Sequence, residues 1–217
     1  MPLRLDVPPP ESLFELRRSL QRLEPVTGGR GLHAAEAAAE AAAVSRGPIE
    51  VADLCPHQVY ALRLDQIQDE HSMSKARPVA WRYLMDADEQ HPMAAEISQD
   101  AGTSQHRFGT VDQGDLARAT SQVVKKLQAS PSEYELRLLD VPALHLVALW
   151  LRRQGSADLF LPLTPVTNRP HLQHLGSVSE EEWGRTLLEL ADRKRSEPDD
   201  LTLPAEDEGE TNVQVKG

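Results

Sequence analysis

The chain has 217 residues, of which 34 are acidic and 23 are lysine or arginine, so its formal net charge is −11 at pH 7. This length allows one domain with appendages or two small domains. No basic stripe of the kind that binds nucleic acid or an anionic membrane is visible, so the composition disfavours both as partners and leaves a cationic protein surface as an alternative.

The single cysteine, Cys55, cannot form a disulfide within the chain, which fits a reducing compartment. The first residues carry charges throughout and lack the continuous apolar stretch of a secretory signal. The apolar run over residues 141–151 is shorter than the roughly 18 residues of a membrane span. The sequence therefore predicts a cytoplasmic protein with no membrane insertion.

Residues 1–48 are predicted to form an N-terminal extension that begins with an extended, proline-rich arm. Ser12 and Glu15 have the spacing of a capping box and predict a helix. Leucines recur at intervals of three, four and three residues and share one helical face: Leu13, Leu16, Leu20 and Leu23. We expect this face to pack on the protein's own core, and the alternative is that it is offered to a partner.

A second helix is predicted over residues 33–44, which consist mainly of alanine and glutamate. A preceding TGGRG segment predicts a flexible joint, and the Arg46-Gly47-Pro48 sequence predicts the helix end. Because alanine removes little apolar area from water, we expect this helix to be peripheral or to act as a spacer.

The pattern changes to alternation of apolar and polar residues from residue 59, which predicts a strand over residues 59–65. Residues 79–86 and 93–97 are predicted to pair as a hairpin, with Trp81 and Tyr83 on one face of its first strand. The polar residues 99–112 are predicted to form a loop. Residues 113–127 follow as a helix with an apolar stripe.

Three further strands are predicted over residues 134–138, 144–150 and 158–163. The second has apolar residues on both sides, including Trp150, and is expected to be central, with His145 buried or partly buried in it. Pro162 is expected to place the last strand at an edge or to end its pairing. Ser179 and Glu182 have capping-box spacing and predict a C-terminal helix.

The predicted fold class is therefore α+β, a mainly antiparallel sheet of about six strands with one central packed helix and with helices near both ends. Residues 49–195 are assigned to this core. Residues 196–217 carry seven acids against Lys216 and are predicted to be a disordered acidic tail.

Candidate chemical groups are few. His171 and His174 could approach one metal ion from a helix, but no further ligands follow at a zinc-site spacing. Cys55 and His57 place a thiol near an imidazole, although a cysteine before a core strand is more typical of a small buried side chain. The sequence assigns no catalytic, cofactor-binding or metal-binding residue.

The function hypothesis is a non-enzymatic module for protein–protein interaction or assembly, whose partner is another protein. One alternative is a regulatory domain that binds a small molecule on the sheet face around Trp81 and Tyr83. The other is a hydrolase-like enzyme that uses Cys55 or the histidines. The candidate interaction or pocket residues are Leu13, Leu16, Leu20, Trp81 and Tyr83.

Overall fold

The computed structural model describes residues 3–22, 54–85, 92–100, 102–103, 105–129, 133–164 and 176–197. The helices of this part are α1 (Pro10–Arg22), α3 (Asp115–Gln128) and α4 (Glu180–Ser196). The strands are β1 (Leu3–Arg4), β2 (Leu54–Ala61), β3 (Arg77–Met85), β4 (Met93–Gln99), β5 (His106–Asp112), β6 (Tyr134–Val141), β7 (Leu146–Arg152), β8 (Leu159–Pro162) and β9 (Val178–Ser179). The predicted alanine-rich helix lies outside the described residues, as do residues 198–217 of the predicted tail.

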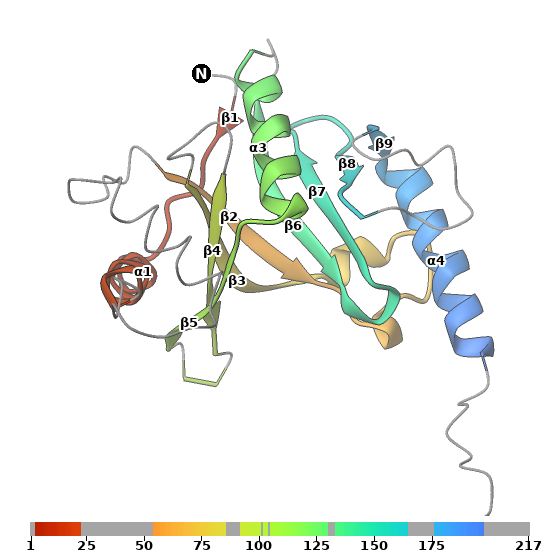
Figure 1. Cartoon of the computed structure of the whole chain (residues 1–217). Coiled ribbons are helices and arrows are strands. Elements are labelled where there is room, and N and C mark those ends of the chain that lie inside the picture. The colour runs from red at the N-terminus through yellow and green to blue at the C-terminus, as the bar shows by residue number, and fades with distance from the viewer. Residues whose placement is uncertain are drawn as a thin grey trace, which may run out of the picture.

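All the strands belong to one sheet with the order β5-β4-β3-β2-β6-β7-β8-β9, and β1 also pairs with β6. Neighbouring strands are antiparallel except at β6, which is parallel to both β1 and β2. β2 reaches β6 only from Gln58 onward, and β1 pairs with the beginning of β6 at Tyr134. The first half of β2 therefore pairs with β3 but not with β6. The fold is α+β with a mostly antiparallel sheet (Figure 1).

The cross-strand register shows which residues share a face of the sheet. One row of neighbours packs in the core beneath α3 and contains Ala80, Val59, Leu138 and Leu149. The adjacent row lies on the opposite face and contains Trp81, Gln58, Arg137 and Trp150. Trp81 belongs to the core beneath α1 and Trp150 to the core beneath α4. Helix α3 therefore covers one face, and α1 and α4 lie apart on the other (Figure 1).

The six predicted strands correspond to β2, β3, β4, β6, β7 and β8. The prediction of a loop over residues 99–112 was wrong, because His106–Asp112 forms β5. Much of β5 is exposed, so its sequence lacks the strong alternation of a half-buried strand. The two-residue strands β1 and β9 were also missed, and β2 begins at Leu54 rather than at residue 59.

Three local features differ from the sequence expectations. Ser12 does not cap α1, because the helix begins at Pro10, a residue suited to a first turn, and the Ser12 hydroxyl instead lies 2.7 Å from the Tyr83 hydroxyl. Strand β7 begins at Leu146, after a 3-10 turn. His145 follows that turn in the left-handed region with φ 51° and is exposed rather than buried.

The C-terminal helix starts where the capping box predicted it. The Ser179 hydroxyl accepts a hydrogen bond from the Glu182 backbone at 3.3 Å, and α4 runs from Glu180 to Ser196. Trp183 and Leu187 are buried against the sheet. None of the helices in the described ranges has the length and apolar character needed to cross a bilayer.

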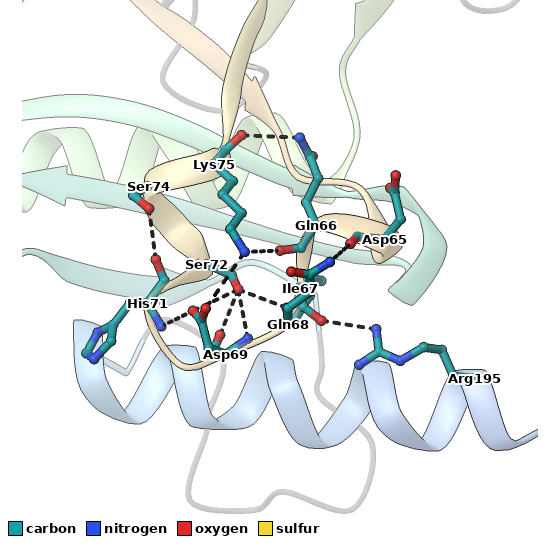
Figure 2. A network of polar contacts seen from close by, with 10 residues as sticks. All are labelled: Asp65, Gln66, Ile67, Gln68, Asp69, His71, Ser72, Ser74, Lys75 and Arg195. Carbon is teal, nitrogen blue, oxygen red and sulfur yellow. Dashed lines mark hydrogen bonds and ion pairs between the residues drawn. The ribbon is translucent and has the colours of Figure 1, made fainter.

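The connection between β2 and β3 is held by its own polar groups and by α4 (Figure 2). The Ser72 hydroxyl accepts hydrogen bonds from the backbones of Gln68 and Asp69 and donates to the Asp69 carbonyl at 2.8 Å. Arg195 at the end of α4 donates to the carbonyls of Leu64 and Ile67 at 3.1 and 3.0 Å. These bonds fasten the connection to α4 and so close the core beneath that helix.

Candidate functional site

The five candidate residues from the sequence lie together beneath and beside α1. Leu16 and Leu20 are buried in one core with Trp81 and Tyr83, and Leu13 is partly buried at the rim of this core. The structure therefore brings the leucine face of α1 onto the sheet face that carries the two aromatic rings. Among the large apolar side chains of α1, the exposed one is Phe14, with 66% of its surface accessible.

Strand β5 forms one edge of the sheet, and β4 is its one strand neighbour among the described residues. The Asp100 N–H donates to the Gln105 carbonyl at 2.9 Å, and the Ser98 hydroxyl donates to the Arg107 carbonyl at 3.2 Å. Gln105 and Arg107 therefore face β4. Because successive residues of an antiparallel strand alternate, the backbone groups of His106 and Phe108 point away from the sheet. No described residue pairs with them.

The surroundings of this edge differ on the two faces. Phe108 pairs with Ile97 of the core beneath α1, and Phe108 and Val111 are partly buried against that core. Helix α1 contacts β5 there and covers the adjacent part of this core. On the other face, Arg107 pairs with Ser98 and is exposed. An edge with open backbone groups beside an apolar surface can accept an additional strand.

Sequence reasoning missed this edge because β5 was interpreted as a loop. A short signal was present, since Phe108, Thr110 and Val111 are residue types enriched in strands. The intervening Gly109 weakened that signal. It lies at a register irregularity, where a Cβ atom would approach the Glu96 carbonyl oxygen to 3.3 Å.

Cys55 and His57 lie two residues apart on β2 and therefore on the same face, beneath α3. The His57 Nδ1 atom is 3.1 Å from the Cys55 carbonyl oxygen, so Nδ1 carries the proton and donates. Burial raises the pKa of the Cys55 thiol to about 12. At neutral pH this leaves about one molecule in 10⁵ as the nucleophilic thiolate, which is unfavourable for cysteine catalysis.

A buried charge cluster lies on the same face next to His57. Arg82 is 3% exposed, and its guanidinium contacts Asp112 at 2.6 Å and Glu96 at 3.7 Å. Asp112 also accepts the Gly114 backbone N–H at 2.7 Å, at the start of α3. The cluster therefore joins β3, β4 and β5 to the first turn of α3. The buried positive charge of Arg82 is therefore paired with the carboxylates of Asp112 and Glu96, as a buried arginine requires.

We expect His57 to make the protein less stable in acid. Burial, followed by the nearby Arg82 charge, lowers the pKa of His57 from 6.5 to about 4. The unfolded chain therefore binds this proton first, so stability is full above pH 6.5 and falls as the pH decreases toward 4. Urea titration should show a loss of roughly 2–3 kcal/mol between pH 7 and pH 4.5. His57→Gln should lack this component, and an unchanged pH dependence in that variant would contradict the assignment.

An open depression of about 1140 Å³ lies where β1, β6, β7 and the start of α4 meet, and charges of both signs line it. Arg4, Glu135, Arg152 and Glu180 are among the lining residues, all of them exposed or half-buried. Nearby, Arg137 pairs with Glu135, and its guanidinium lies over the rings of Tyr60 and Trp150, at 4.8 and 4.9 Å from their centroids. This open surface, lined by charges of both signs, lacks the apolar, enclosing walls of a small-molecule site.

The described ranges contain no group of three or more histidine, cysteine, aspartate or glutamate side chains that could hold a metal ion. His171 and His174 lie outside those ranges. The chain matches no protein-family model, no curated protein and no solved structure.

Proposed function

We propose that the protein is a non-enzymatic interaction module that binds an extended segment of another protein along β5. The supporting observation is the open edge of β5, where the backbone groups of His106 and Phe108 point outward with no partner among the described residues. An added strand would satisfy these groups with backbone hydrogen bonds, which give affinity largely independent of sequence.

The apolar surface beside the edge supports the same function. A strand added to β5 would place every second side chain on the α1 face, next to Phe108. Natural edge strands are usually blocked by lysines, by proline or by a covering segment. Strand β5 contains neither lysine nor proline, and its register irregularity at Gly109 leaves the first half of the strand regular.

The enzymatic alternative has less support. The Cys55 thiol has a pKa of about 12, and the buried His57 ring donates to a backbone carbonyl rather than to a catalytic partner. The small-ligand alternative placed its site around Trp81 and Tyr83, but α1 packs on these rings. Neither observation favours a second candidate function.

The proposed function can be tested with two variants of the full chain. His106→Pro removes an outward N–H without breaking the β4–β5 ladder, and Phe108→Asp replaces the apolar side chain beside the edge with a charge. We expect both to release a partner that the wild-type chain captures from cell extract, as identified by mass spectrometry. The matched control is Gln122→Asp, which adds the same charge to an exposed position of α3 and should retain the partner.

Circular dichroism should confirm that both edge variants remain folded. A partner that binds equally to the wild type and to both edge variants would place the interaction elsewhere on the molecule and contradict docking at β5.

A further inference from the structure

We propose that one buried water molecule binds between His57 and Arg82, where it accepts a hydrogen bond from Arg82 Nε–H and donates one to His57 Nε2. The two residues are direct cross-strand neighbours on β2 and β3. Both are almost fully buried, with exposures of 0% for His57 and 3% for Arg82. This site lies in the interior of the protein and is independent of docking at β5.

His57 supplies a hydrogen-bond acceptor that has no donor. Its Nδ1 atom donates to the Cys55 carbonyl oxygen at 3.1 Å, so Nε2 of the neutral ring carries no proton and can only accept. The ring is neutral at pH 7, because burial and then the Arg82 charge lower its pKa to about 4. Nε2 is buried and has no hydrogen-bond partner within the described ranges. A buried acceptor in this state is costly, so native proteins usually give it a partner.

Arg82 supplies the complementary donor. Its two terminal nitrogens face carboxylates, Nη2 at 2.6 Å from Asp112 and Nη1 at 3.7 Å from Glu96. The Nε–H is a further donor, and it is buried with no acceptor in the part of the chain that the structure describes. Cross-strand partners share a face of the sheet, so this donor and the His57 acceptor lie on the same side. One donor and one acceptor are therefore left over next to each other.

This combination selects water over an ion. A chloride ion could accept from Arg82 but has no proton to donate to His57. A metal cation at His57 Nε2 would be repelled by the guanidinium of Arg82. Water donates and accepts at once, and buried waters typically bridge polar groups that lack other partners.

Helix α3 covers this face with small side chains where it begins. Asp112, which contacts Arg82, also accepts the Gly114 N–H at the start of the helix, so the first half of α3 is the part near the site. The buried residues of that half are Ala117, Ala119, Thr120 and Ser121. They occupy less space above the sheet than the valines and leucine that the second half buries, which favours a small polar ligand here.

The direct test is a crystal structure of the full chain, grown near pH 7 and at a resolution that shows ordered water. We expect an electron-density peak about 3 Å from both His57 Nε2 and Arg82 Nε. A direct hydrogen bond between these two atoms would overturn the proposal. A structure with no peak there, or with a peak that contacts only one of them, would overturn it as well.

NMR of the ¹⁵N-labelled full chain tests the same site in solution. The Arg82 Hε proton should show a nuclear Overhauser effect to water with the sign of a bound molecule. His57→Phe keeps a buried ring but removes the acceptor, so we expect the effect to be lost. The matched control is His71→Phe, the same change at an exposed histidine, which should retain it. An effect that persists in His57→Phe, or a nitrogen–nitrogen coupling between Arg82 Nε and His57 Nε2 in the wild type, would contradict a bridging water.

Discussion

Gly184→Ala is expected to destabilise the protein by about 3 kcal/mol or more, at or beyond the upper end of the usual cost of overpacking. A Cβ atom at this position would lie 1.9 Å from the Glu70 carbonyl oxygen and 2.9 Å from its carbonyl carbon. Both obstructing atoms belong to the backbone and cannot rotate away. Helix α4 would have to move from the connection between β2 and β3, which would open the core around Trp183.

The sign of this effect is informative, because alanine is intrinsically the better helix former by up to about 1 kcal/mol. Urea unfolding monitored by circular dichroism measures the change. Arg185→Ala is the matched control, since the Arg185 side chain is 52% exposed on the same helix, and we expect a change within about 0.5 kcal/mol. Equal or greater stability of Gly184→Ala would show that α4 does not rest on the Glu70 backbone.

The sequence predicted those elements that one periodic pattern describes. Leu16 and Leu20 recur at helical spacing, Trp81 and Tyr83 alternate as in a strand, and each pair is buried as its period indicates. That these two faces meet could not be predicted, because periodicity identifies an apolar face but not the element that covers it. The contact between them joins segments about 65 residues apart in the chain.

The parts that escaped prediction depend on partial burial or on backbone contacts. Strand β5 has one covered face and one free edge, so polar residues and Gly109 interrupt its apolar pattern. Gly184 resembles any helical glycine until the Glu70 carbonyl is placed against it. The burial of His57 could not be predicted either, because its sequence neighbours do not indicate that α3 covers this part of β2. The proposed docking edge belongs to this group.

Trp150→Ala is expected to cost roughly 3–5 kcal/mol, the usual range for truncating a large buried aromatic side chain. The ring packs edge-on against Tyr60 at 5.2 Å and stacks with Phe160 at 5.8 Å between centroids. Its Nε1–H also donates to Asp158 Oδ2 at 2.7 Å. Alanine would remove all three contacts from the middle of the core beneath α4.

Trp150→Phe separates packing from hydrogen bonding at the same position. Phenylalanine keeps much of the apolar contact with Tyr60 and Phe160 but leaves Asp158 without the indole donor. We expect a smaller cost, about 1–2 kcal/mol, from the lost hydrogen bond and the smaller ring. Both variants are compared with the wild type by urea titration. A change below about 1 kcal/mol for Trp150→Ala, the size expected of an ordinary surface site, would contradict the position of Trp150 in the core.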